Sequence, residues 1–298
     1  SEVIEVLPEL AESANGFARD RNQRIGIFDF EHHKVLHRQI EIEQGLKDAI
    51  ENHQLAIYLQ PKYRISDKSI AGYEALVRWH HPREGFISPG EFVPIAEKSS
   101  LGLELDHYVL VRVFELIASA RATIRDFPPV AINITPAHFS RVDFHKLVLA
   151  GIADANIPIE SVELEITEGA VMERSEEARQ NLDALRSQGV RIAIDDFGTG
   201  YSSLAYLHTL PVQVLKIDRQ FTQRLGGESR DSRIVSAILA IADALELEVV
   251  AEGIENAEQH AKLRELKCQR GQGYLMARPA PWRVWSANLI DHSQEKSK

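Results

Sequence analysis

Residues 191–203 read RIAIDDFGTGYSS, an apolar strand-like run that ends on two adjacent carboxylates and a glycine-containing turn. Successive side chains of a strand point to opposite faces, so Asp195 and Asp196 can serve one site only where the strand ends and the backbone turns. Two close carboxylates repel each other and raise at least one pKa unless a divalent cation neutralises them. The stretch therefore predicts either a metal site at a strand end or an Asp-Asp turn that caps a helix.

Other strand-like runs also carry polar residues. They are 72–79 with Glu74, 130–135 with Asn133, 162–168 with Glu165 and Glu168, 212–218 with Lys216 and Asp218, and 247–254 with Glu252. A helical pattern follows each run, and apolar strands that alternate with amphipathic helices indicate a parallel sheet buried on both faces. The number of strands is close to eight, which predicts an α/β fold of the (βα)8 barrel type with its site at the carboxyl ends of the strands. An open doubly wound sheet is the alternative, but no glycine-rich dinucleotide motif follows an early strand.

One connection departs from the regular barrel pattern. The strand-like runs 55–65 and 70–79 are separated only by Ser66-Asp67-Lys68-Ser69. This connection is too short for a crossover helix, so it predicts a hairpin of antiparallel strands. We therefore expect a modified TIM barrel with one antiparallel strand.

Length and composition restrict the class of protein. The chain has 298 residues, 44% hydrophobic, and a formal net charge of -10, which argues against binding to duplex nucleic acid. A single cysteine, Cys268, excludes an intrachain disulfide and a cysteine-rich zinc site. No apolar run reaches the length of about eighteen residues that spans a membrane, and no secretory leader is visible. We expect a cytoplasmic fragment without membrane contact, whose full-length parent is free to be membrane-anchored.

The first residues do not follow the strand-helix alternation. We expect residues 1–33 to be the remnant of a preceding domain or linker, with an extra strand at residues 24–30. Residues 34–298 are expected to form the barrel domain, including a leading helix over about residues 33–50. We expect a loop over residues 82–94, where glycine and proline recur, followed by helices around residues 92–98 and 106–120.

Seven motifs, in order and spacing, resemble the EAL domain family over roughly residues 40–285. They are EALVRW at 74–79, Asn133, EITE at 165–168, DDFGTGYSS at 195–203, KID at 216–218, AEGIE at 251–255 and QGY at 272–274. The resemblance implies a modified TIM barrel that hydrolyses cyclic di-GMP to linear pGpG with two Mg2+ or Mn2+ ions, and it implies a homodimer. The N-terminal piece is similar to the end of a GGDEF domain and its linker helix, as in GGDEF-EAL tandem proteins.

The resemblance also implies roles for individual residues. Glu74, Asn133, Glu165 and Asp195 would hold the first ion, Asp195 and Asp196 the second, with Lys216 and Glu252 as catalytic residues and Glu252 as the general base. An alternative for Lys216 is an ion pair with Asp218 on the same strand face. Glu168 would steady the loop after the paired aspartates, or it is an acidic residue favoured in the first turn of a helix.

Contacts to the substrate are expected from polar residues near the strand ends. They are Gln60, Arg78, Asp218, Glu255, Gln272 and Pro279. Arg78 can bind a phosphate through two hydrogen bonds, and the others can bind guanine or shape the pocket. Each could instead be an ordinary residue of the barrel rim. Three alternative functions stay open: a cyclic di-GMP sensor without activity, a protein-interaction domain, and a metal-assisted proton-abstracting barrel enzyme.

Overall fold

The computed structural model describes residues 30–172, 175–198, 207–226 and 230–286. Residues 24–29 of the predicted strand at 24–30, most of the predicted remnant at 1–33 and much of the turn after Asp196 lie outside these residues. Phe30 belongs to a helix and not to the predicted strand. None of the helices in the described ranges is long and apolar enough to cross a membrane.

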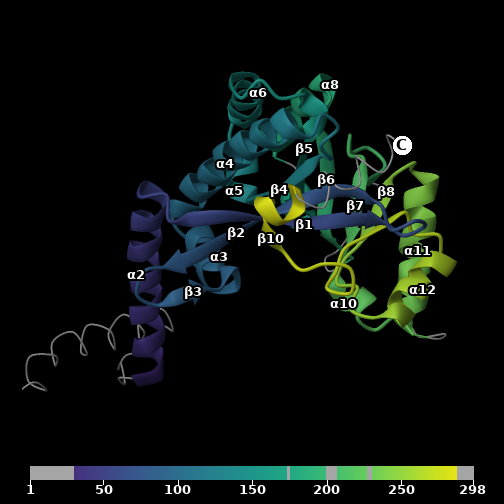
Figure 1. Cartoon of the computed structure of the whole chain (residues 1–298), viewed down its shortest axis with the longest axis horizontal. Coiled ribbons are helices and arrows are strands. Elements are labelled where there is room, and N and C mark those ends of the chain that lie inside the picture. Colours follow the sequence, from purple (N-terminus) through teal and green to yellow (C-terminus); the bar gives the residue numbers. More distant parts are fainter. Residues whose placement is uncertain (1–29, 173–174, 199–206, 227–229, 287–298) are drawn as a thin grey trace, which may run out of the picture.

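Eight strands close into a barrel (Figure 1). They are β1 (Leu55–Arg64), β2 (Ile70–His81), β4 (Val130–Ile134), β5 (Val162–Thr167), β6 (Arg191–Phe197), β7 (Val214–Ile217), β8 (Glu248–Ala251) and β9 (Arg270–Gly271). From β2 round to β9 neighbouring strands are parallel, whereas β1 is antiparallel to both β2 and β9. The predictions of a hairpin and of a modified TIM barrel with one antiparallel strand are confirmed.

Two short strands extend the sheet beyond the barrel. β3 (Gly85–Ile87) pairs with the end of β2, and β10 (Ala280–Pro281) pairs with β1. The predicted loop at 82–94 therefore contains a strand and the start of a helix, since α3 begins at Pro89. Proline suits the first turn of a helix because the missing N–H would have no partner inside the helix there. The proline that indicated a loop instead marks where this helix starts.

Helices surround the barrel (Figure 1). They are α2 (Phe30–Glu51), α3 (Pro89–Glu97), α4 (Leu101–Thr123), α5 (Pro136–Phe139), α6 (Phe144–Asp154), α7 (Glu168–Met172), α8 (Glu176–Gln188), α10 (Arg219–Thr222), α11 (Arg230–Ala244) and α12 (Ala257–Glu265), with a 3-10 turn at Ile159–Ser161. α2 is the expected leading helix, and it packs its buried residues Ile42 and Leu46 into the main core.

The two faces of the strands have different contents. The main core holds the apolar side chains that lie between the strands and the helices, Ile192 and Ile194 among them. Ala193, Val214 and Val250 form a separate small cluster. Because strand side chains alternate, this second face continues into the polar residues two positions further along each strand. Along β6, β7 and β8 the inward face thus passes from a small apolar side chain to a charged side chain at the carboxyl end.

Candidate active site

Lys216 lies at the centre of the carboxyl end of the barrel. Its Nζ atom is 2.6 Å from Oε2 of Glu165, 2.7 Å from Oε1 of Glu252, 3.0 Å from Oδ2 of Asp195 and 3.8 Å from Oε1 of Glu74. Three strands, β2, β5 and β6, and the residue after β8 therefore bring acidic groups to one ammonium, as the carboxyl ends of parallel barrel strands do. These carboxylates raise the pKa of Lys216 above its ordinary value against the opposing effect of burial, so the ammonium stays charged.

The alternative of a Lys216–Asp218 ion pair is not what the structure shows. The Oδ1 atom of Asp218 accepts a hydrogen bond from the backbone N–H of Gln220 and caps α10. Asp218 also hydrogen-bonds Asp196. It therefore belongs to the edge of the site and does not contribute to the group around Lys216.

Glu74 is oriented by two amides. Its Oε1 atom accepts a hydrogen bond from Nδ2 of Asn133 at 2.9 Å, and its Oε2 atom accepts one from Nε2 of Gln272 at 2.6 Å. The same amide of Gln272 contacts Oε1 of Gln60 at 2.9 Å. The structure thus brings together four of the predicted residues, three from separate motifs and Gln60 from β1.

The paired aspartates lie where the strand geometry breaks. Asp196 has a φ of 55°, and the register between β6 and β7 shifts between Ile194 and Phe197. This turn satisfies the condition stated from the sequence: Asp195 points to Lys216, whereas Asp196 contacts Asp218. Burial, the charge of Asp195 and the contact with Asp218 raise the pKa of Asp196 to about 6.

Glu168 joins the end of β5 to the turn that follows β6. Its Oε2 atom accepts a hydrogen bond from the backbone N–H of Gly198 at 3.0 Å. Gly198 has a φ of +95°, and a Cβ atom there would lie 3.0 Å from the ring of Phe221. Glu168 is also the first residue of α7. The hydrogen bond to Gly198 is consistent with the predicted role of Glu168 in holding the loop. Its position at the start of α7 is equally consistent with the alternative, an acidic residue favoured in the first turn of a helix.

Burial has the largest effect on Glu252. It raises the pKa of this carboxyl to about 8, aided by the charges of Asp195 and Glu74 and opposed by Lys216. A group whose pKa lies near neutrality is suited to exchange a proton at physiological pH.

Two hollows flank the charged group. One of about 250 Å³ is lined by β2, α3, α4 and β4, and the other, of about 240 Å³, by residues of β1, β2 and the ends of β8 and β9. The first contains Arg78, Asn133 and Glu165. The second contains Gln60, Glu74, Asp195, Glu252, Glu255 and Gln272. Leu76 belongs to both, so the hollows meet beside Glu74.

The remaining predicted contacts differ in position. Arg78 is half-buried and burial lowers its pKa, while Glu255 approaches Gln223 at the rim. Asp218 and Pro279 are not among the described residues that line the two hollows. Pro279 directly precedes β10, so a position at the start of this strand accounts for it without a contact to the substrate.

Several residues of the site were missed from the sequence. Lys62 and Glu163 lie buried inside the barrel, Arg219 and Tyr274 line the second hollow, and Glu97 and Asp106 line the first. The alternation of side chains along a strand could have indicated Lys62 and Glu163. Lys62 shares a strand face with Gln60, and Glu163 shares one with Glu165. The others come from helices or loops, where no such period applies.

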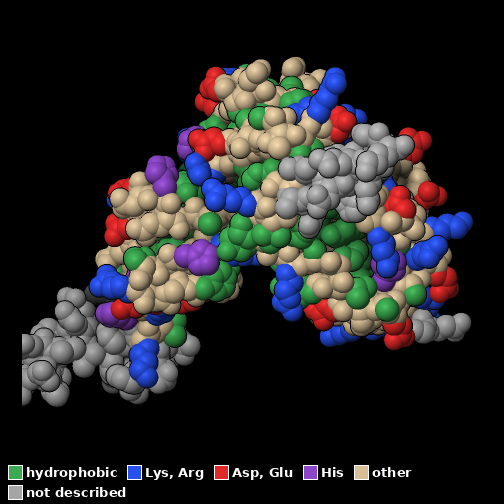
Figure 2. All heavy atoms as spheres, in the orientation of Figure 1, with side chains coloured by type: hydrophobic (Ala, Val, Ile, Leu, Met, Phe, Trp, Pro, Cys, Tyr) green, Lys and Arg blue, Asp and Glu red, His purple; other side chains and the backbone are tan. Residues whose placement is uncertain are grey.

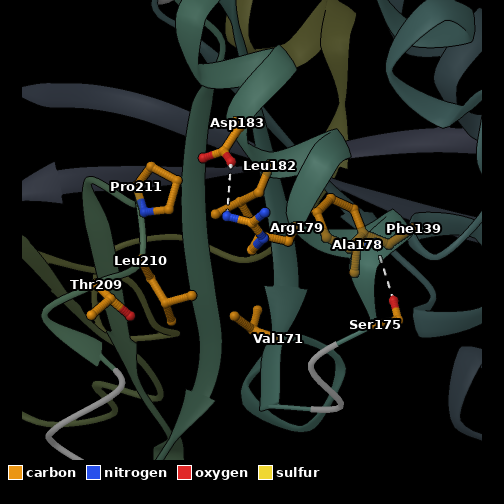
Figure 3. A pocket seen from close by; sticks show the side chains of 10 residues that line it. All are labelled: Phe139, Val171, Ser175, Ala178, Arg179, Leu182, Asp183, Thr209, Leu210 and Pro211. Carbon is orange, nitrogen blue, oxygen red and sulfur yellow. Dashed lines mark hydrogen bonds and ion pairs between the residues drawn. The ribbon is translucent and has the colours of Figure 1, made fainter.

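A third hollow lies apart from the charged group (Figure 3). It measures about 160 Å³ and is lined by residues of α5, α7, α8 and the segment 209–211. Arg179 and Asp183, one turn apart on α8, point toward each other, with Nη1 of Arg179 4.0 Å from Oδ2 of Asp183. None of the predicted site residues borders it.

The donor atoms fit a hard divalent cation. Carboxylate oxygens with one amide suit Mg2+ or Mn2+. Of the predicted metal ligands, all but Asp196 lie around Lys216 or are hydrogen-bonded to Glu74. Within the described ranges no three His, Cys, Asp or Glu side chains enclose a ready-made metal position. The oxygens of these carboxylates are directed at the ammonium, so a bound ion would share them with Lys216.

The closed barrel, its reversed strand and its lysine-centred acidic rim define an α/β-barrel protein with a charged site at the carboxyl end. The chain belongs to the EAL domain family, which matches residues 43–279.

Relatives of known name support this assignment. The chain is 38% identical over 244 residues to the cyclic di-GMP phosphodiesterase NbdA of Pseudomonas aeruginosa, covering 82% of this chain and 31% of NbdA. It is 37% identical over 243 residues to MucR of the same organism, a bifunctional diguanylate cyclase/cyclic di-GMP phosphodiesterase, covering 82% and 36%. The chain thus spans about a third of the length of these relatives. The solved structure of the PaMucR phosphodiesterase in complex with c-di-GMP aligns with a TM-score of 0.79 at 36% identity, over 82% of this chain and 99% of that chain.

Proposed function

We propose that this EAL domain is a phosphodiesterase that hydrolyses cyclic di-GMP to linear pGpG and depends on Mg2+ or Mn2+, with two ions in the site. The observation that carries the proposal is the convergence of four carboxylates on Lys216 between two adjoining hollows. The names of NbdA and MucR support the same substrate and reaction.

The metal ligands in this proposal are the predicted ones. Glu74, Asn133, Glu165 and Asp195 would hold one ion, and Asp195 with Asp196 would hold the other. Bound Mg2+ or Mn2+ supplies a water of lowered pKa and charge to stabilise the phosphoryl oxygens.

The side chains of the chain perform the remaining tasks. Glu252 lines the second hollow, where it accepts a proton from the attacking water. Lys216 holds Glu252 in place and stabilises negative charge that grows on the phosphate. Arg78, in the first hollow, binds a phosphate oxygen through its guanidinium group.

The shape of the site suits a substrate with two similar halves. The two hollows have nearly equal volumes and meet beside Glu74 and Leu76. Cyclic di-GMP has two guanosine halves joined by two phosphodiester bonds, so one half fits each hollow while a phosphate lies over the carboxylates. Glu255, Gln60 and Gln272 then face the base or the sugar in the second hollow.

The charge distribution on the face shown in Figure 2 is consistent with a small ligand rather than duplex nucleic acid. Basic and acidic side chains are interspersed over its described residues and do not gather into one basic area of the kind that binds duplex nucleic acid. The homodimer, the cytoplasmic location and the division at residue 33 stay predictions.

The test is incubation of the chain with cyclic di-GMP in excess Mg2+, in excess Mn2+ and in EDTA, with products separated by chromatography. Formation of pGpG only with metal is the expected result. The matched control is Asp195→Asn, which removes a metal-binding charge at nearly constant volume and should abolish the product while the circular dichroism spectrum stays unchanged. Binding of cyclic di-GMP without any product in the wild-type chain would contradict the proposal and support the sensor.

A further inference from the structure

The two carboxylate oxygens of Glu165 are held by two different lysines. Nζ of Lys216 is 2.6 Å from Oε2, and Nζ of Lys62 is 2.6 Å from Oε1. The side chains of Lys62 and Glu165 are 2% and 0% exposed, so neither interaction is weakened by solvent. Only Oε2 belongs to the group around Lys216, because Oε1 is directed toward β1, the strand that carries Lys62.

Lys62 is itself anchored from the opposite end of the barrel. Its Nζ atom is 2.7 Å from Oε1 of Glu163, and Oε2 of Glu163 is 3.3 Å from Nε of Arg191. Arg191 in turn contacts Glu248, which also pairs with Arg270 at 2.9 Å. Opposite charges therefore alternate from Glu165 down to Arg270 at the start of β9.

This row restricts how Glu165 can move. Rotation of Oε1 toward the rim would leave the buried ammonium of Lys62 with one partner in place of two, and losing a partner of a buried charge is costly. Glu165 therefore presents one oxygen, Oε2, to anything bound at the rim.

The number of oxygens that a carboxylate offers affects which ion is preferred. Ca2+ takes six to eight oxygen ligands and readily accepts both oxygens of one carboxylate, whereas Mg2+ requires octahedral geometry at short distances. We propose that Lys62 is a specificity-determining residue: by holding Oε1, it limits Glu165 to single-oxygen ligation and so favours Mg2+ over Ca2+. This inference rests on the metal binding contained in the proposed function.

The experiment is calorimetric titration of the nucleotide-free chain with Mg2+ and with Ca2+. In Lys62→Met, the lost ammonium changes the electrostatic attraction of both divalent ions alike, so this effect cancels in the ratio of their affinities. Release of Oε1 should raise the Ca2+/Mg2+ affinity ratio on the order of tenfold, the lower end of the effect seen when a partner of a metal ligand is removed.

Two further variants complete the test. Lys62→Met/Glu163→Leu removes a cation and an anion together, so it keeps the barrel interior neutral if the single variant does not fold; the ratio should rise in it too. Glu248→Gln is the matched control, because it weakens the row at its partly exposed end without touching Lys62 or Glu165, and the ratio should stay at the wild-type value.

The outcomes separate this inference from the proposed function. A wild-type chain that binds Mg2+ but shows an unchanged ratio in the folded Lys62 variants overturns the role of Lys62 alone. A ratio that rises equally in Glu248→Gln also overturns it, since general loosening of the barrel would then be the cause. A wild-type chain that binds neither ion overturns both.

Discussion

The Nζ atom of Lys216 lies 2.7 Å from Oε1 of Glu252, which couples the proposed base to the central cation of the site. The ammonium is buried and the carboxylate borders the second hollow. Lys216 lowers the pKa of Glu252, yet burial keeps that pKa at about 8. The base is therefore held by a cation, and its carboxylate form, which accepts the proton, becomes the major form only above about pH 8.

Replacing this base without changing its size should separate binding from hydrolysis. In Glu252→Gln we expect turnover of cyclic di-GMP to fall by about 10²- to 10⁴-fold, the usual contribution of a general base. Binding of the nucleotide should persist, because the amide has the same shape. Product chromatography and equilibrium binding measure the two effects, and unchanged turnover would remove Glu252 as the base.

Lys216→Met should destabilise the chain in the absence of divalent metal. The change leaves the buried Glu165 and the partly buried Asp195 and Glu252 facing one another without their cation. Removal of the partner of a buried charge costs about 3–5 kcal/mol in the free energy of unfolding. Added Mg2+ should restore part of this stability because it neutralises the same oxygens. Thermal unfolding with and without Mg2+ measures the effect, with Lys47→Met on the exposed side of α2 as the control. An unchanged metal-free midpoint would contradict the central role of Lys216.

The contact between Glu168 and Gly198 leads to a prediction about metal affinity. Glu168→Ala removes the acceptor for the backbone N–H of Gly198, which lies two residues after Asp196. We expect metal affinity to fall by about 10- to 100-fold, the effect typical of partners that orient ligands. Glu168→Gln retains an oxygen acceptor and should lose less. If both variants bind metal as the wild type does, only the role at the start of α7 remains.

Glu163 gives the chain a pH-dependent stability. Burial opposes ionisation, but the charge of Lys62 and its hydrogen bond lower the pKa of Glu163 to about 2. A lowered pKa stabilises the fold fully above the unfolded value near 4.3, and this stabilisation is lost as pH falls through the folded value. The lost stability is on the order of 3 kcal/mol. Urea unfolding of the wild type between about pH 5 and pH 2 should show a steeper decline than that of Glu163→Gln. Parallel declines would contradict the assignment.

The thiol of Cys268 should be unreactive in the folded chain. It is 4% exposed, its Sγ atom lies 3.2 Å from the carbonyl oxygen of Arg270, and burial raises its pKa to about 12. Because the thiolate is the reactive form, Ellman's reagent at pH 8 should label it only after unfolding. The rate of labelling in increasing urea then reports the opening of the barrel near β9. Rapid labelling without denaturant would show that this part of the barrel opens readily.

Much of the barrel could be predicted because its signals are local. Apolar runs with polar ends indicated the strands, and the four-residue connection at 66–69 indicated the hairpin, since no crossover helix fits in it. The start of α3 was missed because Pro89 is compatible both with a loop and with a first helical turn.

The sequence by itself determined which acidic and amide residues stand at the strand ends, because that depends on alternation along each strand. Only the tertiary structure decided that Lys62 binds Glu163 and Glu165, which lie 101 and 103 positions away in the chain. No local pattern encodes such a contact, since it arises when the antiparallel β1 closes the barrel beside β2 and β9. Closure also directs the oxygens of Glu74, Glu165, Asp195 and Glu252 at one ammonium, because strands far apart in sequence share one narrow interior.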